Sequence, residues 1–319
     1  FTVSSIHACA PALRQVFRTM LKRIVRTLST TGWVGLILVA LTVLTALVSL
    51  VWTPYDPTLA QAADRLQGPS FEHLLGTDRY GRDTLSRIMA GAQVTLFVGI
   101  VAVGISAFVG VPLGLVAGMN RGSFIDAAIG RCNDLLLAFP ALLTAIMAGA
   151  VFGASTLTAM IAIGIAGIPA FARVTRSGTL QVINQDYIAA ARISRVPGSV
   201  IALRHVMANI LGLIIVQASI AFALAILAEA ALSYLGLGTP PPTPSWGRML
   251  QDSQTLLGTA PLLAVFPGVA IAATVLGFNL LGDGLRDVFD PKLRTSQAAT
   301  SSHSAASKAT APKRKGGQK

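Results

Sequence analysis

The chain has 319 residues, of which 53% are hydrophobic and only 12% are charged, against about 25% charged in a typical soluble domain. Its net charge of +12 does not indicate nucleic-acid binding, because the basic residues gather at both ends and in loops and aromatic residues make up only 6%. Two distant cysteines, Cys9 and Cys132, provide neither a disulfide framework nor a metal site. The composition therefore predicts a membrane protein that crosses the bilayer several times.

Long runs without a charged residue mark the predicted membrane spans. The first span, residues 32–52, is too long to be the apolar part of a signal peptide, and no small-residue cleavage site follows it. The run from Leu135 to Ala172 has 38 residues, whereas one helix needs about 20 to cross a bilayer, so it is predicted to hold two spans joined by a turn at residues 152–156. We therefore predict an all-α membrane protein with six transmembrane helices, the others at about residues 94–119, 206–228 and 262–281.

The arginine and lysine positions predict the orientation. With six spans, the N-terminal segment 1–31, the 119–131 loop, the 173–208 loop and the 284–319 tail share one side and hold most of the basic residues. Membrane proteins keep such residues in the cytoplasm, so both termini are predicted to be cytoplasmic. With five spans, the 173–208 loop and the tail would change sides. The tail is expected to be disordered after about residue 295, because it has almost no large apolar residue.

The two segments on the outer side are residues 53–91 and 229–261, which leaves a core from residue 92 to residue 283. Asp83 is predicted to cap an amphipathic helix that leads into the second span. Four prolines between Gly236 and Gly247 are expected to prevent regular helix there.

Three features near the spans are candidate parts of a transport pathway. Phe139-Pro140 and Phe266-Pro267 occur in similar contexts and predict either broken helices along a pathway or ordinary kinks in a packed bundle. Glu229 is interpreted first as an interfacial acid that is hydrated or caps locally, with a pathway group at the outer mouth as the alternative. Asp134, beside Arg131, is likewise interpreted as an interfacial acid.

The motifs of several enzyme classes are absent from the sequence. There is no phosphate-binding P-loop, no HExxH motif and no GxSxG motif, so neither a catalytic residue nor a metal site is predicted. An ion-coupled secondary transporter usually needs ionisable groups at mid-membrane, and the few acids here fall near span ends. The energy for any transport is therefore expected to come from a partner.

The 173–208 loop is predicted to be the place where such a partner docks. It holds five arginines and a single acid, Asp186, which can cap the start of a helix. The alanines at 189–191 favour helix, and Pro197-Gly198 is expected to end it.

The side chains of this helix predict how it would dock. Tyr187 and Ile188 are expected to supply apolar contact, and Arg192 and Arg195 a polar rim. The alternative is a helix that lies on the lipid headgroups and is held by its arginines.

Six segments, in the same order, resemble the inner-membrane permease subunits of dipeptide and oligopeptide ABC importers over about residues 31 to 294. The resemblance implies a type I ABC importer permease core of five spans, preceded by one extra N-terminal helix, in the inner (cytoplasmic) membrane of a bacterium. It also implies that this chain binds no cofactor and catalyses nothing, because ATP and Mg are bound by separate ATPase subunits. The six segments are Leu75–Asp83, Leu136–Pro140, Asp186–Arg192, Glu229–Gly238, Pro244–Gly247 and Leu281–Asp287.

The same resemblance implies the partners. A second permease subunit would form the translocation path with this chain, two ATPase subunits would dock from the cytoplasm, and an extracytoplasmic binding protein would deliver a short peptide. Membrane lipid surrounds the spans, and no nucleic acid is expected. Three alternatives remain: import of nickel or another small solute, an ion-coupled secondary transporter, and a purely structural or signalling membrane protein.

In this family the cytoplasmic loop forms a coupling helix that docks in a groove on an ATPase subunit. The resemblance therefore assigns three sets of site residues. The coupling set is Asp186, Tyr187, Ile188, Ala189, Ala190, Ala191, Arg192, Arg195, Gly198, Arg204 and His205. The candidate pathway or gate set is Phe139, Pro140, Glu229, Phe266 and Pro267, and the candidate binding-protein contacts are Asp78, Arg79, Arg82, Asp83 and Trp246.

The coupling loop departs from the family pattern at three places. Ala189 stands where an acid is usual, Arg195 where a glycine is usual, and Met207-Ala208 where Leu-Pro is usual. Gly198 is expected to take over the turn that the missing glycine would make. These changes motivate the hypothesis that the partner permease's loop carries most of the coupling.

Overall fold

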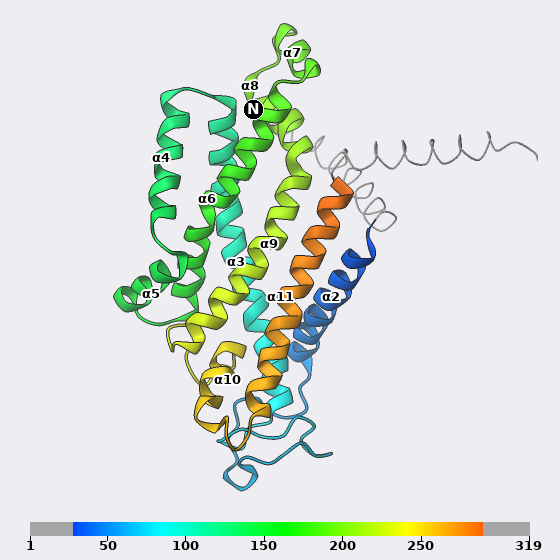
Figure 1. Ribbon diagram of the computed structural model, residues 1–319, viewed down its shortest axis with the longest axis vertical. Coiled ribbons are helices and arrows are strands. Elements are labelled where there is room, and N and C mark those ends of the chain that lie inside the picture. Colours follow the sequence, from blue (N-terminus) through cyan, green and yellow to red (C-terminus); the bar gives the residue numbers. More distant parts are fainter. Residues whose placement is uncertain (1–27, 290–319) are drawn as a thin grey trace, which may run out of the picture.

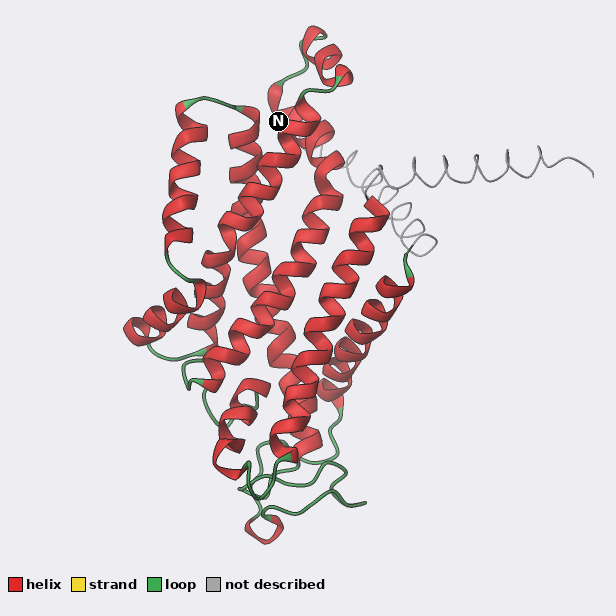
Figure 2. Cartoon of the chain, in the orientation of Figure 1, coloured by secondary structure: helices red, strands yellow, loops and turns green. Residues whose placement is uncertain are grey.

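The computed structural model describes residues 28–289, which fold into helices joined by loops (Figure 2). The predicted disorder after about residue 295 and most of the 1–31 segment lie outside the described residues. The long helices are α2 (Thr30–Val51), α3 (Thr84–Met119), α6 (Thr156–Ile183), α9 (Met207–Tyr234) and α11 (Leu262–Phe289). The shorter elements are η1 (Ala62–Asp64), α4 (Phe124–Ala138), α5 (Ala141–Phe152), α7 (Asp186–Ile193), α8 (Gly198–Val200), the π-helix η2 (Ile201–Val206), α10 (Trp246–Ser253) and η3 (Gln254–Leu256).

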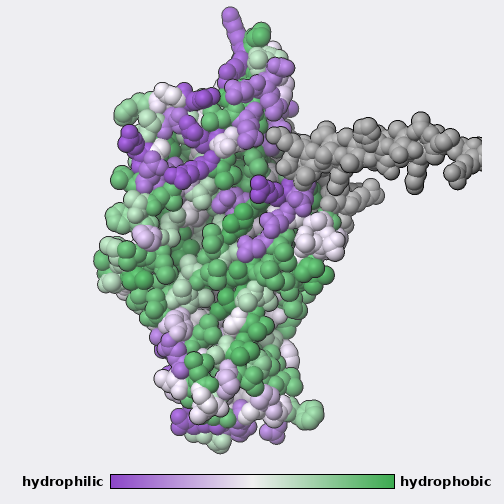
Figure 3. Space-filling model, in the orientation of Figure 1, coloured by the Kyte–Doolittle hydropathy of each residue, from purple (hydrophilic) through white to green (hydrophobic). Residues whose placement is uncertain are grey.

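The helices are long and apolar enough to cross a membrane, as the sequence predicts. Five single helices meet this condition, and the bent pair α4–α5 makes six if it is one span. Figure 3 shows the corresponding surface, in which hydrophobic residues cover the middle of the molecule and hydrophilic residues gather toward its two ends. The prediction of an all-helical membrane protein is therefore confirmed for residues 28–289, and its six spans are reached when α4 and α5 count as one.

The predicted division of the 38-residue uncharged run is only partly correct. The turn near residues 152–156 exists, since α5 ends at Phe152, Gly153 has a φ of 90° and Ser155 caps α6. However, the preceding span begins earlier, at Phe124, and bends by 78° between α4 and α5. The bend lies at Phe139-Pro140, because proline lacks an N–H and pushes the residue before it out of helical geometry. The expected 119–131 loop is correspondingly short.

Helices α3 and α6 approach each other closely along a row of glycines spaced four residues apart. A Cβ atom on Gly110 would lie 2.6 Å from the Ile168 carbonyl oxygen, and one on Gly114 would lie 2.3 Å from the Ala172 carbonyl oxygen. At Gly118 the Cβ would lie 2.6 Å from the Thr179 side chain. Small residues let membrane helices pack backbone to backbone, so this row fixes the centre of the bundle.

The first helix, α2, packs along α11 at the side of the bundle (Figure 1). Gly35 faces the α11 backbone, where an added Cβ would lie 2.4 Å from the Leu281 nitrogen. Thr42 and Thr274 join the two helices through buried hydroxyls 3.0 Å apart. The helix that precedes the five-span core therefore belongs to the same packed bundle.

The two ends of the bundle differ in what they carry. Figure 1 shows α7 projecting beyond the long helices at one end, whereas α10 and the loop between α2 and α3 lie at the other. The expectation of no regular helix between Gly236 and Gly247 holds up to Ser245, which caps α10 by accepting a hydrogen bond from the Arg248 backbone nitrogen. The prolines end before that cap, so α10 forms inside the predicted outer loop.

Candidate functional site

Helix α7 is anchored to the bundle by one buried side chain. Ile188 is 0% exposed and belongs to a buried cluster with Leu115 of α3, Val182 of α6 and Ile210 of α9. Two η2 residues, Ile201 and Val206, complete the cluster. A force on α7 would therefore reach three of the long helices through direct packing.

This anchoring corrects the predicted role of Ile188 in α7. Ile188 was expected to offer apolar contact to a partner, but its side chain is buried in the internal cluster and cannot reach one. Tyr187 is 41% exposed, and its hydroxyl accepts a hydrogen bond from the Asn209 side chain of α9 at 3.1 Å. The two residues therefore hold α7 in place, and Tyr187 alone keeps an open face.

The apolar side chains that are exposed at this end, and so free to contact a partner, are not the ones that the sequence singled out. Ile193, the last residue of α7, is 84% exposed, and Leu203 of η2 is 67% exposed. Ala189, Ala190, Arg192 and Arg204 are also exposed. The free surface at this end is thus two apolar side chains among small and cationic ones, which is the pattern of a docking surface with a polar rim.

The start and the end of α7 also differ from the prediction. Asp186 is the first helical residue, and the preceding Gln185 occupies the cap position without a side-chain hydrogen bond. The helix ends at Ile193, before Pro197, and Pro197 instead leads into α8. The predicted helix is therefore present, but its expected cap and stop signals lie elsewhere.

Arg195 itself makes the turn that a glycine would usually make. Its φ is +56°, in the left-handed region, whereas Gly198 lies in α8 and does not take over the turn. A residue with a Cβ atom in this region costs roughly 1 kcal/mol relative to glycine. The loop thus turns at Arg195 at an energetic cost.

Arg195→Gly is expected to stabilise the end of α7 by about 1 kcal/mol, because glycine relieves the left-handed strain. Hydrogen exchange of the α7 amides in the purified protein would measure this as roughly fivefold slower exchange. The control is Ser194→Gly, because Ser194 has a φ of −72° and gains nothing from glycine. Equal protection in Arg195→Gly and wild type would contradict the strain assignment.

The missing proline at residue 208 has a visible consequence. Helix α8, η2 and α9 run on without interruption, so that residues Gly198–Tyr234 form one continuous helical span. Ala208 keeps its N–H, and nothing forces a break between the loop and the membrane. The segment that follows α7 is consequently continuous with the bundle helix α9.

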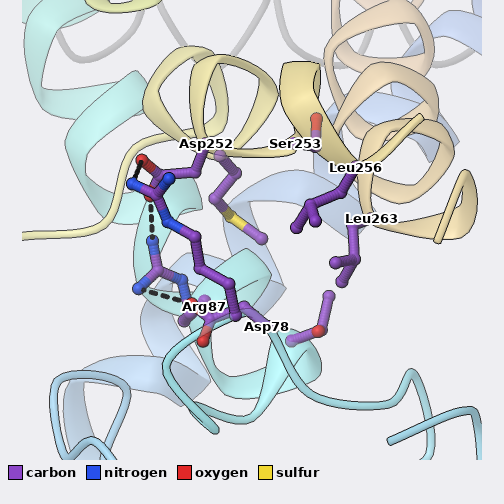
Figure 4. A pocket seen from close by; sticks show the side chains of 9 residues that line it. Asp78, Arg87, Asp252, Ser253, Leu256 and Leu263 are labelled. Atoms are coloured by element: carbon purple, nitrogen blue, oxygen red, sulfur yellow. Dashed lines mark hydrogen bonds and ion pairs between the residues drawn. The ribbon is translucent and has the colours of Figure 1, made fainter. Parts of the chain in front are cut away.

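At the opposite end, Asp78 and Asp252 join the α2–α3 loop to α10 through arginines. Arg82 lies 2.7 Å and Arg87 3.3 Å from the Asp78 carboxylate. Asp252 of α10 lies 3.2 Å from Arg79. Figure 4 shows Asp78, Arg87 and Asp252 on one side of a small pocket, with Leu256 and Leu263 on the other.

Two of the candidate binding-protein contacts lie inside this outer structure. Asp83 is 3% exposed and caps α3, as predicted, by accepting a hydrogen bond from the Ser86 nitrogen at 2.8 Å. Its other oxygen lies 2.9 Å from Nδ1 of His73. Trp246 is 3% exposed and donates a hydrogen bond to the Ile88 carbonyl. Asp83 and Trp246 therefore build the outer structure and are not available as surface contacts.

The pathway candidates do not come together in one place. Phe139, 59% exposed, lies at the α4–α5 bend, whereas Phe266-Pro267 lies near the start of the unbroken helix α11. The structure thus separates the two similar sequence contexts, since only one of them breaks a helix. A cavity of about 170 Å³ lies instead among α3, α5, α6 and α9, and Gln217 is among the few polar side chains in its lining.

Glu229 is buried and does not line that cavity. It is 1% exposed, and Ser233 one turn later donates a hydrogen bond to it at 2.7 Å. The same Ser233 hydroxyl accepts a hydrogen bond from the Thr239 nitrogen. The carboxylate therefore ties the end of α9 to the loop that follows, as expected of an acid that caps locally, and its role at the mouth of a pathway stays a prediction.

Near the α7 end, α4 is attached to α6 by ion pairs. Arg176 donates to both oxygens of Asp126 at 2.7 and 2.9 Å, and Arg173 donates to Asp134 at 2.9 Å. Asp134 thus pairs across helices with Arg173, although the sequence places Arg131 beside it. A cavity of about 260 Å³, lined by apolar residues as well as by these charged ones, remains between these helices.

Sequence reasoning missed Gln217, Arg248 and Asp252. Gln217 is one of only three polar residues in the uncharged run 206–228, with Asn209 and Ser219, which is a signal visible in the sequence. Arg248 and Asp252 are spaced by four residues after the Ser245 cap, the spacing of an ion pair on one helix face. Their meeting with Asp78 and Arg82 is a long-range contact that local patterns do not encode.

A family model described as binding-protein-dependent transport system inner membrane component matches residues 110–295. A dipeptide transport system permease protein of Alkalihalophilus pseudofirmus is 43% identical over 262 residues, which are 82% of this chain and 86% of that protein. A glutathione transport system permease protein of Pectobacterium atrosepticum is 43% identical over 243 residues, covering 76% and 80% of the two chains. A putative peptide transport system permease protein of Brucella suis is 41% identical over 238 residues, covering 75% and 80%.

Among solved structures, the chain is similar to the MetNI methionine ABC transporter in an inward-facing conformation. The TM-score is 0.53 at 17% sequence identity, and the match covers 63% of this chain and 95% of that one. At this identity the match shows a shared fold, and the part of this chain left over is consistent with an added N-terminal helix.

Proposed function

Because the chain belongs to the family of binding-protein-dependent transport system inner membrane components, we propose that it is the permease subunit of an ATP-driven importer of short peptides. Three similar permeases carry names that specify dipeptide, glutathione or peptide transport, which favours peptide over nickel or another small solute. The chain itself catalyses no covalent step. A second permease would complete the translocation path, and separate ATPase subunits would bind ATP and Mg.

The observation that carries this proposal is the construction of the α7 end. An exposed surface of Ile193 and Leu203 with a cationic rim projects beyond the bundle, while Ile188 ties the same helix to α3, α6 and α9. A partner that grips the exposed side can therefore move the membrane helices through the buried side. An ATPase pair that closes on ATP and opens after hydrolysis would bias two arrangements of the bundle in this way.

The proposed docking of ATPase subunits at α7 also sets the orientation of the chain in the membrane. The α7 end would face the cytoplasm, where ATP is available, with both termini on that side of a bacterial inner membrane. The α2–α3 loop and α10 would then face an extracytoplasmic binding protein. The cavity among α3, α5, α6 and α9 would contribute this chain's half of the peptide path, with Gln217 as a polar group for the peptide backbone.

Co-purification with an activity assay tests the proposal. The chain would be isolated from native membranes in mild detergent and reconstituted in lipid vesicles. We expect a second permease and ATPase subunits in the product, with ATP hydrolysis that rises several-fold when binding protein and a short peptide are both added. Stimulation by nickel and not by peptide would select the small-solute alternative. A chain that purifies alone and transports without ATP would support a secondary transporter and contradict the proposal.

A further inference from the structure

The outer arginine cluster, which comprises Arg79, Arg82, Arg87 and Arg248 with Asp78 and Asp252, is not electrically balanced. Each of its four guanidinium groups lies within 4.0 Å of at least one of the two carboxylates, and no other carboxylate of residues 28–289 pairs with them. The cluster therefore carries two more positive than negative charges. The side chains of Arg82 and Arg87 are 9% and 2% exposed, so water screens this excess poorly.

The hydrogen-bonding capacity of these arginines is also incompletely used. Arg79 Nε is a buried donor without a hydrogen-bond partner among the described residues, and Arg82 Nη2 and Arg87 Nη1 share one acceptor, the Asp78 Oδ2 atom, at 2.7 and 3.3 Å. Tyr80 compensates in part, since the guanidinium groups of Arg79 and Arg82 lie 4.7 and 4.6 Å from its ring centre. Buried donors that lack a partner or must share one acceptor cost free energy, and an added anion would offset that cost.

A cavity gives an anion access to the cluster. It has a volume of about 200 Å³ and is lined by Arg82, Arg87 and Arg248, with Asp252 as its one acid. The remaining wall contains Tyr80, Thr58, Thr243 and the Pro241-Pro242 turn. A side-chain carboxylate on a short stem fits this space, and three guanidinium groups could bind it with charge-assisted hydrogen bonds.

We propose that this cavity receives one carboxylate side chain of the extracytoplasmic binding protein when it docks. The inference rests on the proposed function for the identity of the partner. A carboxylate on the transported peptide is a poorer occupant, because the cavity shares no lining residue with the intramembrane cavity among α3, α5, α6 and α9. Charge complementarity at such a contact would set the orientation and the rate of docking.

The test uses Arg248→Gln, because Arg248 is the cluster member whose loss disturbs the fold least. Its side chain is 24% exposed, and its single ion pair, to Asp252, is 3.6 Å long. In the reconstituted complex with saturating peptide, we expect the binding-protein concentration for half-maximal ATPase stimulation to rise about tenfold. Arg248→Lys should stay within about threefold of wild type. The control is Arg65→Gln in the same outer segment, because Arg65 is exposed and forms no ion pair among the described residues; its side chain contacts the cluster only by donating a hydrogen bond to the Arg79 backbone carbonyl.

A second experiment, a peptide titration, distinguishes a carboxylate of the binding protein from one of the peptide. A third experiment measures melting temperature and does not depend on transport. If Arg248→Gln shifts only the peptide concentration dependence at saturating binding protein, the occupant is the peptide and the proposal is overturned. In the third arm, N-acetylglutamate amide at millimolar concentration should raise the melting temperature of wild type and Arg65→Gln, relative to equal sodium chloride, and leave Arg248→Gln unchanged.

Identical responses of all variants to N-acetylglutamate amide and chloride would overturn the anion site while leaving the proposed function intact. Conversely, a wild-type complex that no binding protein stimulates would remove the proposed function and with it the partner named here, whereas the melting-temperature arm would still report on the anion site.

Discussion

Ile193→Asp is expected to reduce peptide-stimulated ATP hydrolysis by at least about tenfold without lowering the amount of folded protein. Ile193 is 84% exposed at the end of α7, so a carboxylate there remains hydrated and costs the free subunit at most about 1 kcal/mol through the helix dipole. In the complex it would be buried in the ATPase groove as an unpaired charge, which is strongly unfavourable. The measurement is ATPase activity of the reconstituted complex, together with the ATPase subunits retained on purification.

Two comparison variants give this result its meaning. Ile193→Leu keeps the apolar contact and should retain activity within about twofold. Ile188→Asp places the charge inside the buried cluster at the base of α7 and should lower the yield of folded protein instead. Normal stimulation in Ile193→Asp would show that α7 of this chain does not dock, and would favour the hypothesis that the partner permease's loop carries the coupling.

Gly114→Val is expected to prevent correct packing of α3 on α6, at a cost of about 3 kcal/mol or more. A Cβ atom at this position would lie 2.3 Å from the Ala172 carbonyl oxygen, so two helix backbones would have to separate. Because Gly110 and Gly118 flank the contact one turn away on each side, the separation would spread along the bundle. We expect a melting temperature lowered by about 10 °C, or no folded protein, in size-exclusion thermostability measurements.

The matched control lies on the same helix. Gly104 is exposed, and a Cβ atom there has nothing within 4 Å. Gly104→Val changes the same residue type in the same membrane helix, so it should leave the melting temperature within a few degrees of wild type. A similar loss in both variants would attribute the effect to helix propensity and not to the α3–α6 contact.

The membrane spans could be predicted because the bilayer imposes a simple rule on composition. Residues 32–52 were predicted and Thr30–Val51 found, and Asp83 was correctly predicted to cap α3, because both signals are local. Helix α4 was missed in part because Arg131 and Asp134 interrupt the uncharged run, although both lie on a helix that is exposed over most of its length.

The candidate site was less predictable because it depends on which way short helices face. An eight-residue helix with Tyr187, Ile188 and Ile193 offers apolar groups on more than one side, and only tertiary packing decides that Ile188 turns inward. The outer cluster was half predicted, since its 78–83 segment was singled out but Arg248 and Asp252 were not. The ion pair between Arg82 and Asp252 joins residues that are more than 150 positions apart, and no local pattern in the sequence reveals such a contact.

The most direct test of the coupling claim is site-specific photo-crosslinking from residue 193 in native membranes. A photoreactive amino acid at Ile193 is predicted to form an adduct with an ATPase subunit, with a yield that changes when ATP is added. The same group at Leu257, 53% exposed at the opposite end, should form no such adduct. Crosslinking of residue 193 to lipid alone, with or without ATP, would contradict the account, because α7 would then lie on the membrane surface and have no ATPase to follow.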